Sequence, residues 1–264
     1  MRPADVANCT PDNGPTQLLT DGFRNAVVVV IGGRGGIGAE VCRQAAAMGA
    51  RVVAVSSTTG DAGLTQEVDS GAVALVKADI RVTEDLRRLA ESIDSHLGRV
   101  DVLVNTAGSS TQVSLRDLDA LTDNLITEVF NANAIGVLAS IRELAPLLRK
   151  GTHPVIVNVG SVAARTGVGS NLAYVGAKAA VDAMSIGLAK ALAPAIRVIG
   201  VAPSALETGF VKGRDAQFIE RTIAATPLGR LTTIGEVAAA VLVAARVLTA
   251  TTGVVIAVDG GRHL

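Results

Sequence analysis

Two side chains that could move a proton stand four positions apart in the segment NLAYVGAKAA, residues 171–180. Tyr174 is the only tyrosine among 264 residues, and Lys178 follows it about one helical turn later. Residues four apart share a face of a helix, so both side chains can point into one site. A free phenol has a pKa of about 10, and a neighbouring ammonium group favours its ionised form. The spacing therefore indicates an acid/base pair, although an isolated Tyr-x-x-x-Lys is more often a surface tyrosine beside a solvated lysine.

Glycines cluster in the stretch VVVVIGGRGGIGAE, at the junction between an expected strand and an expected helix. Glycine lets the backbone turn tightly and approach a pyrophosphate, whose charge is favoured by the free amides at a helix N-terminus. The stretch lacks the Gly-Lys-Ser/Thr ending of a P-loop, which argues against ATP or GTP hydrolysis. A plain tight turn could give the same letters, yet the position at the first strand-to-helix junction favours a nucleotide. The residues assigned to this contact are Gly32, Gly36, Ile37 and Gly38.

Short hydrophobic runs alternate with helical patterns and supply the frame for these residues. The runs are nearly continuously apolar, as burial on both faces of a parallel sheet requires. We therefore expect an α/β fold, a doubly wound parallel sheet of about seven strands with helices on both faces, in a single domain. The expected strands are AVVVVI (26–31), RVVAV (51–55), AVALV (72–76), VDVLVN (100–105), PVIVNV (154–159), IRVIGVA (196–202) and VVIAV (254–258).

The same alternation sets the expected domain boundaries. Residues 25–264 carry the pattern and form the expected catalytic domain that binds a dinucleotide, whereas residues 1–24 are expected to form a flexible extension. Within the domain, Thr83 is the expected N-cap of a helix with Glu84 and Asp85 in its first turn.

Composition argues against several classes of partner. The 24 Lys plus Arg residues balance 24 Asp plus Glu, so no basic field exists for nucleic acid or an anionic membrane surface. No apolar run approaches the roughly 20 residues of a membrane span, and the N-terminus lacks the apolar core of a signal peptide. Cys9 and Cys42 have neither metal-binding nor redox spacing, so we expect no metal and a cytoplasmic location.

Taken in order, the motifs resemble those of the short-chain dehydrogenase/reductase family. The resemblance begins with Gly32-x-x-x-Gly36-x-Gly38 and continues through NTAG (105–108), Asn133 in FNANAIG, Ser161 in VNVGS and Tyr174-x-x-x-Lys178. Later segments, VAPSALETGF (201–210), PLGRL (227–231) and TGVVIAVDGG (252–261), extend it from about residue 25 to the C-terminus. Each motif is loose alone, and their order makes the set specific. The nearest resemblance is to the 3-oxoacyl-acyl-carrier-protein reductase type, which implies a Rossmann-type fold and an NAD(P)-dependent oxidoreductase.

The resemblance implies a role for each catalytic candidate. Tyr174 would donate a proton to a carbonyl oxygen while hydride arrives from the nicotinamide, and the Ser161 hydroxyl would bond to the same oxygen. Lys178 would activate Tyr174, and both residues would also contact the cofactor. Asn133 would distort its helix and hold an ordered water that links to Lys178. This intact set argues against a nucleotide-binding regulator that has lost its chemistry.

The end of the second strand indicates which nicotinamide cofactor binds. Dinucleotide folds that hold the ribose 2′-hydroxyl place an acidic residue there, whereas VAVSSTTG offers the hydroxyls of Ser56, Ser57 and Thr58. Arg34 can add a cation for a 2′-phosphate, although the basic residue common in similar enzymes stands one position later, at Gly35. We therefore expect NADP, with NAD as the second choice.

Further cofactor contacts are implied by the resemblance alone. Asp79 and Ile80 would meet the adenine, and Pro203 would lie near the nicotinamide. The remaining contacts would come from Asn105, Ala107, Gly108 and Thr208. Two positions depart from the family pattern: Ile31 replaces a threonine whose hydroxyl ties the glycine loop, which predicts a looser loop, and Ser204 replaces a glycine.

The leading interpretation is NADPH-dependent reduction of a ketone, such as a 3-oxoacyl thioester or another β-keto metabolite, to a secondary alcohol. The alternatives are an NAD-dependent dehydrogenase of a secondary alcohol, sugar or steroid-like compound, and a catalytically silent nucleotide-binding regulator. A substrate lid is expected around residues 205–226, whose letters name no substrate. Small residues at helical spacing after Tyr174 favour close helix packing, and the resemblance implies a homotetramer, with a homodimer next.

Overall fold

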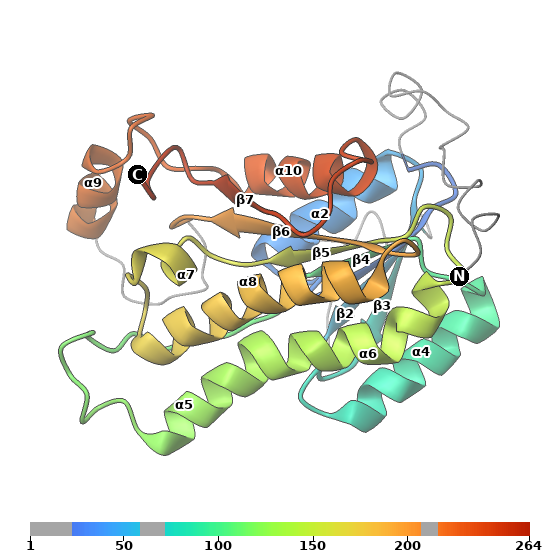
Figure 1. The fold of residues 1–264 in the computed structure, drawn as a ribbon, viewed down its shortest axis with the longest axis horizontal. Coiled ribbons are helices and arrows are strands. Elements are labelled where there is room, and N and C mark those ends of the chain that lie inside the picture. The colour runs from blue at the N-terminus through green and yellow to red at the C-terminus, as the bar shows by residue number, and fades with distance from the viewer. Residues whose placement is uncertain (1–22, 59–71, 207–215) are drawn as a thin grey trace.

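The computed structural model of the chain describes residues 23–58, 72–206 and 216–264. Its seven strands form one parallel sheet in the order β3-β2-β1-β4-β5-β6-β7 (Figure 1). The expected doubly wound α/β fold in a single domain is therefore confirmed. The strands are β1 (Val27–Ile31), β2 (Arg51–Ser56), β3 (Val73–Lys77), β4 (Val102–Asn105), β5 (Val155–Val159), β6 (Arg197–Pro203) and β7 (Val255–Val258).

The N-terminal boundary of the folded part lies slightly before the expected one. Phe23 is buried and belongs to the same core cluster as Ala26 and Val28, so the domain includes residue 23. Nearly all of the extension expected over residues 1–24 lies outside the described residues.

The central strands explain why the hydrophobic runs are continuous. Every residue of β1, β4 and β5 is buried, because helices cover both faces of the sheet. The strand order reverses at β1, with β2 and β3 on one side and β4 to β7 on the other. In open α/β sheets, ligands bind outside the carboxyl ends of the strands at such a switch point.

Helices α2 and α10 contact each other and cover one face of the sheet, whereas α4, α6 and α8 cover the other (Figure 1). Helix α5 packs along α8 outside this second layer. The helices are α2 (Gly36–Ala47), α4 (Thr83–Leu97), α5 (Asp123–Phe130), α6 (Gly136–Leu148), α7 (Ala163–Thr166), α8 (Leu172–Leu192), α9 (Ala216–Ala224) and α10 (Ile234–Arg246), with a π-helical turn, η2, at Asn131–Ile135.

Side-chain caps define the starts of some helices. The Oδ1 atom of Asn171 accepts a hydrogen bond from a backbone N–H in the first turn of α8, and Thr233 with Glu236 forms a capping box on α10. Thr83, the N-cap that the sequence predicts for α4, is instead its first helical residue, and Val82 precedes it without a side-chain cap. That prediction was therefore wrong by one residue.

Two helical runs among the described residues are long and apolar enough to cross a membrane, although composition alone predicts none. They are Asp123–Leu148, which joins α5, η2 and α6 and has a mean hydropathy of 1.2, and α8, with 1.3. Both runs pack within the fold: α6 and α8 lie on the sheet, and α5 lies on α8. Packing of this kind covers part of each run: 50% of the apolar window of Asp123–Leu148 and 33% of that of α8 are buried inside the fold.

Charged side chains tie together the amino ends of the strands. Asp101 is fully buried and accepts hydrogen bonds from the backbone N–H groups of Val27 (2.7 Å) and Thr152 (2.6 Å) and from Arg99 Nε (3.1 Å). Arg197, at the start of β6, donates to backbone carbonyl oxygens in the last turn of α10 and in the segment that follows it. Burial lowers the pKa of Arg197 to about 10. These charges hold the ends of segments that are distant in sequence.

Candidate active site

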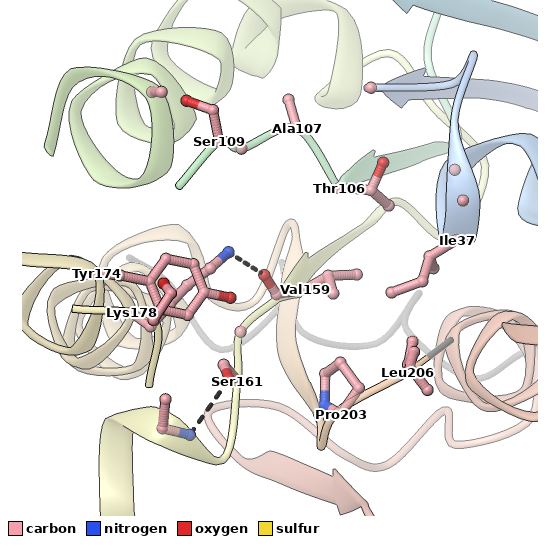
Figure 2. Close-up of a pocket in the computed structure, with 18 of the residues that line it drawn as sticks. Ile37, Thr106, Ala107, Ser109, Val159, Ser161, Tyr174, Lys178, Pro203 and Leu206 are labelled. Atoms are coloured by element: carbon pink, nitrogen blue, oxygen red, sulfur yellow. Dashed lines mark hydrogen bonds between the residues drawn. The ribbon is translucent and has the colours of Figure 1, made fainter. Parts of the chain in front are cut away.

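A cavity of about 1000 Å³ opens at the carboxyl ends of the strands and runs from the glycine loop between β1 and α2 to the first turns of α7 and α8 (Figure 2). Of the predicted site residues, those that line it are Gly32, Gly36, Ile37, Gly38, Ser56, Ser57, Asp79, Ile80, Ala107, Gly108, Ser161, Tyr174, Lys178 and Pro203. Those that do not line it are Arg34, Thr58, Asn105 and Asn133. Thr208 lies outside the described residues.

The glycine loop lies directly against the end of β4. Gly32 has a φ of 83°, in the left-handed region, and a Cβ atom there would overlap the backbone nitrogen of Ala107. A Cβ on Gly38 would overlap the carbonyl oxygen of Gly32. The start of α2 has no side-chain cap and no acidic residue in its first turn. An anion such as a pyrophosphate would therefore be favoured at this helix N-terminus.

In the family pattern, a threonine hydroxyl at position 31 ties the glycine loop to its neighbour. Here the hydroxyl comes from Thr106 instead. Ile31 cannot supply one, but the Thr106 hydroxyl donates to the Ile31 carbonyl oxygen (2.8 Å), and the Thr106 backbone N–H donates to the same oxygen (2.9 Å). Thr106 Oγ1 also fills the space that a Cβ atom on Gly32 or Gly38 would occupy. The Thr106 hydroxyl, directly after β4, thus supplies a bond to this turn that Ile31 cannot, and the looser loop stays a prediction.

Hydroxyl groups at the end of β2 meet a cation from the glycine loop. Arg34 Nη1 donates to Thr58 Oγ1 (2.7 Å), and Thr58 Oγ1 lies 3.2 Å from Ser56 Oγ. Ser56 and Ser57 are part of the cavity wall. The Nε atom of Arg34 is buried and has no hydrogen-bond partner among the described residues. This group could hold a phosphate, which combines negative charge with several acceptor oxygens.

Asp79 lies on the cavity wall, but Arg81 holds its carboxylate. Arg81 Nε donates to both carboxylate oxygens (2.9 and 3.1 Å), and Nη2 donates to Oδ2 (2.6 Å). The Arg81 hydrogen bonds lower the pKa of Asp79. Ile80 follows on the wall and fills the space beside Gly136, where a Cβ atom would overlap it. An adenine ring would therefore meet an apolar surface at Ile80 and a carboxylate that is already paired.

Tyr174 and Lys178 project from α8 toward the same part of the cavity (Figure 2). Lys178 Nζ lies 5.8 Å from the centroid of the Tyr174 ring and donates to the backbone oxygen of Val159, the last residue of β5 (2.9 Å). Lys178 is only 4% exposed, and this burial lowers its pKa to about 8, while the charge of Asp182 opposes the shift. At neutral pH the lysine therefore still places a positive charge beside the phenol.

Ser161 connects β5 to α7 and lies on the cavity wall. Its Oγ accepts a hydrogen bond from the backbone N–H of Ala163 (3.2 Å). Because this bond uses a lone pair of the oxygen, the hydroxyl proton can still be donated to a bound group. Pro203 and Leu206 line the cavity across from Tyr174 (Figure 2), and Ser204 lies between them in the chain.

Asn133 lies in η2, so the helix distortion expected at this residue is present. Its Nδ2 donates to the backbone oxygens of Ser109 (2.7 Å) and Val129 (2.9 Å). Its Oδ1 is buried and has no hydrogen-bond partner among the described residues. A buried carbonyl oxygen in this state suits an ordered water, which needs polar partners of this kind.

The side chain of Asn105 points into the core. Its Nδ2 donates to Asn158 Oδ1 (2.8 Å), and its Oδ1 accepts from the Ser140 hydroxyl (2.8 Å). Asn158 Nδ2 donates in turn to Ser185 Oγ (2.9 Å). These buried bonds join β4 and β5 to α6 and α8, which carry parts of the site. Asn105 therefore supports the frame, and the later residues of its motif line the cavity.

Several cavity residues carry no motif that could identify them. They come from loops and helix ends that only the fold brings to the site, and only their closeness to motif residues could have pointed to some of them. They include Ser109, Gln112, Val168, Ser170 and Arg262. Within the described parts of the chain, no group of three or more His, Cys, Asp or Glu side chains could hold a metal ion.

Comparison with known proteins gives matches over nearly the whole chain. A family model described as enoyl-(acyl carrier protein) reductase matches residues 32–263. A Streptomyces violaceoruber protein named as a ketoacyl reductase of the granaticin polyketide synthase is 35% identical over 249 residues, covering 94% of this chain and 100% of that protein. L-fucose dehydrogenase of Mus musculus is 32% identical over 255 residues, covering 92% of this chain and 90% of its own length.

Solved structures show the same arrangement of strands and helices. The Pseudomonas aeruginosa RhlG/NADP active-site complex superimposes with a TM-score of 0.83 at 30% identity, covering 92% of this chain and 98% of that one.

Proposed function

The chain belongs to the short-chain dehydrogenase/reductase family of oxidoreductases, and we propose that it catalyses NADPH-dependent reduction of a ketone to a secondary alcohol. The observation that carries this proposal is the meeting of Ser161, Tyr174 and the buried Lys178 in one cavity with the glycine loop. Reduction of a carbonyl needs a proton donor and a hydrogen-bond donor at the oxygen, beside a bound source of hydride. A module that only binds a nucleotide has no need of this set, which argues against the silent regulator.

The residues present fit NADP as the proposed cofactor. The family uses nicotinamide dinucleotides, and the similar RhlG structure is a complex with NADP. The uncapped start of α2 would hold the pyrophosphate, and Arg34 with Ser56 and Thr58 would hold the 2′-phosphate, for which Arg34 Nε is a buried donor without a partner among the described residues. When bound, the nicotinamide supplies hydride to the substrate carbon. NAD remains the second choice, and a contact from Thr208 stays a prediction.

The protein's own side chains would manage the proton. The Ser161 hydroxyl donates a hydrogen bond to the carbonyl oxygen, and Tyr174 gives its phenolic proton to the same oxygen as negative charge develops there. The buried ammonium group of Lys178 then lies beside the phenolate and stabilises it, since burial strengthens the attraction between charges. After turnover, Lys178 would pass a proton to the phenolate. A water held by Asn133 Oδ1, which has no partner among the described residues, would help to return a proton to Lys178.

A 3-oxoacyl thioester or another β-keto metabolite is the substrate class that we propose, on the likeness to a ketoacyl reductase. The likeness to L-fucose dehydrogenase supports the alternative, an NAD-dependent dehydrogenase of a secondary alcohol, sugar or steroid-like compound. The same residues would serve either direction. The lid expected around residues 205–226 stays a prediction because residues 207–215 lie outside the described part, although Phe218 of α9 lines the cavity.

The test follows nicotinamide absorbance with the purified full chain. NADPH or NADH is supplied with 3-oxoacyl thioesters, diketones, cyclic ketones and, because of the family model's description, enoyl thioesters; secondary alcohols and sugars with NADP or NAD test the reverse direction. We expect turnover of a β-keto compound with NADPH. Turnover of sugars with NAD alone would favour the alternative, and cofactor binding without turnover of any carbonyl or alcohol would contradict the proposal.

We also propose that the chain forms a homotetramer, with a homodimer as the next choice. Large apolar side chains are exposed on η2, α6 and α8, namely Ile135, Leu138 and Ile186. Val243 on α10, which covers the opposite face of the sheet, and Val254 beside the edge strand β7 are exposed as well. Two apolar surfaces of this kind suit two interfaces of a closed assembly. Light scattering at micromolar concentration tests this, and a monomeric mass would contradict it. The expected cytoplasmic location stays a proposal.

A further inference from the structure

The segment that follows the NTAG motif, residues 109–113, is held between two buried asparagines. Asn133 Nδ2 donates to the backbone oxygen of Ser109 (2.7 Å). From the other side, Asn171 Nδ2 donates to the backbone oxygen of Thr111 (2.7 Å) and to Ser110 Oγ (3.1 Å). The same short stretch is therefore bound by η2 and by the start of α8.

Asn171 uses its other end on the catalytic helix. Its Oδ1 accepts a hydrogen bond from the backbone N–H of Tyr174 (2.7 Å), and the residue is only 1% exposed. Both ends of one buried carboxamide are thus engaged, the oxygen by the backbone N–H of Tyr174 and the nitrogen by segment 109–113. Because Asn171 is bonded at both ends, a shift of segment 109–113 is passed on to the first turn of α8, where Tyr174 lies.

Segment 109–113 also forms part of the cavity wall. Ser109 and Gln112 line the cavity, as does Ser170, the residue before Asn171. The Ser110 and Ser170 hydroxyl oxygens lie 2.5 Å apart, and the Val113 backbone N–H donates to the backbone carbonyl oxygen of Ser170 (2.8 Å). The wall beside the proposed carbonyl site and the first turn of α8 are therefore one hydrogen-bonded unit.

We propose that Asn171 is a positioning residue that couples segment 109–113 to Tyr174. The carbonyl oxygen of a substrate held against this segment would then lie at a fixed distance from the Tyr174 phenol. Proton transfer needs a heavy-atom distance of roughly 2.6–3.2 Å, and a displacement of about 1 Å can slow a reaction by about a hundredfold. Asn171 does not itself line the cavity, so it acts through Tyr174. The inference rests on the proposed function, because it assigns the role to carbonyl reduction.

The test separates the two ends of the carboxamide. Asn171→Asp keeps an acceptor for the Tyr174 N–H, and a carboxylate is favoured at a helix N-terminus, but the donor to Thr111 is lost. Asn171→Ala removes both ends. The matched control is Thr122→Ala, which removes the cap of α5, where Thr122 Oγ1 accepts from the Leu125 N–H (3.3 Å). Thr122 does not line the cavity.

Asn171→Asp should stay folded but melt below the wild-type temperature, because one carboxylate oxygen faces the Thr111 carbonyl oxygen in a buried site. Assayed well below that temperature, it should keep its KM for NADPH within about twofold and lose at least about tenfold in kcat for the ketone. Thr122→Ala should keep kcat within about twofold, and Asn171→Ala should lose kcat and also melt lower. Amide hydrogen exchange across residues 109–113 should be at least about tenfold faster in Asn171→Asp than in the wild type.

Two results would overturn the coupling: wild-type kcat in Asn171→Asp, or unchanged exchange across residues 109–113 in that variant. The exchange measurement needs no turnover. If the wild-type chain reduces no ketone, the proposed function fails, and the exchange comparison still decides whether Asn171 couples the two segments.

Discussion

The two ends of the sheet both bury charged or polar side chains, but they satisfy them differently. At the amino ends, Asp101 accepts from two backbone N–H groups and from Arg99, and Arg197 donates to carbonyl oxygens in the last turn of α10 and in the segment that follows it. At the carboxyl ends, Asn133 Oδ1 and Arg34 Nε are buried without partners among the described residues. Buried polar groups are normally satisfied within the protein, so unsatisfied ones mark places that a ligand or water completes.

The contrast has one exception. Arg246 Nε, near the amino ends, is also buried without a hydrogen-bond partner among the described residues, but its guanidinium lies 5.3 Å from the centroid of the Phe23 ring. The position over an aromatic face gives this cation a partner of another kind. We infer that the polar groups at the amino ends serve folding, whereas Asn133 Oδ1 and Arg34 Nε at the carboxyl ends serve ligands or water; the fully bonded Asn105 supports the frame instead. Changes at the two ends should therefore affect different measurements.

The largest expected effect is on the rate. Tyr174→Phe removes a hydroxyl from the carboxyl-end cavity and keeps the ring that packs in the α5–α8 cluster. Folding and NADPH binding should be retained, whereas kcat for ketone reduction should fall about 10²–10⁴-fold, the usual share of a general acid. Steady-state kinetics, with cofactor binding measured by fluorescence, check this. Near-full turnover in the variant would remove Tyr174 from the mechanism.

The next effect belongs to the amino ends and should appear as lost stability. Asp101→Ala leaves two backbone N–H groups and Arg99 without their acceptor, which should lower the free energy of unfolding by about 3 kcal/mol. Urea unfolding measures this change, and kcat of the folded fraction should stay within about twofold. The matched control is Asp94→Ala, which breaks the exposed ion pair with Lys150 (2.7 Å) and should cost under about 1 kcal/mol. Equal losses in the two variants would contradict the assignment.

Features set by local sequence were predictable, because burial and helical spacing leave a direct pattern in the letters. The expected strand RVVAV (51–55) corresponds to β2 at Arg51–Ser56. It was predictable because a strand covered on both faces must be apolar throughout. The spacing of Tyr174 and Lys178 places both in one cavity, because helix geometry fixes which residues share a face. The helix start at Thr83 was missed by one residue.

Features that depend on distant contacts were not predictable. Asn171 and Thr111 are 60 residues apart, and no local pattern links them. The hydrogen bond from the Thr106 hydroxyl to the Ile31 carbonyl oxygen becomes evident only once β1 and β4 are known to be neighbours. The inward direction of Asn105 was also hidden, because a strand buried on both faces gives no alternation that tells one face from the other.

A smaller effect should appear in the pH dependence of the carboxyl-end site. Burial lowers the pKa of Lys178 from 10.5 to about 8. Reduction needs the protonated Tyr174–Lys178 pair, so kcat/KM with NADPH should fall about tenfold per pH unit above pH 8, whichever group loses the proton. Alcohol oxidation should rise over the same range. A profile that stays flat to pH 10 would contradict this.

The same shift predicts the sign of a stability change. A lysine whose pKa is lowered by folding holds fewer protons in the folded than in the unfolded chain between about pH 8 and 10.5. The contribution of Lys178 to the free energy of unfolding should therefore rise with pH across this window. Lys178→Met should remove that contribution. The free energy of unfolding of Lys178→Met minus that of the wild type, measured by urea unfolding, should therefore be lower at pH 9.5 than at pH 7.5.

The smallest expected effect is on cofactor choice. Ser56→Asp places a negative charge at the end of β2, where Ser56 lines the cavity close to Thr58 and Arg34. Repulsion of the 2′-phosphate should raise KM for NADPH at least about fivefold, since two like charges a few ångströms apart repel by about 1 kcal/mol even in water. KM for NADH, which lacks this phosphate, should rise less or fall, because a carboxylate can accept a hydrogen bond from the ribose 2′-hydroxyl.

The control Ser95→Asp adds the same charge on the exposed side of α4 and should leave the ratio of the KM values for NADPH and NADH unchanged. If Ser56→Asp also leaves that ratio unchanged, the cluster around Arg34 does not hold the 2′-phosphate, and its unpaired Nε would be a structural feature like that of Arg246.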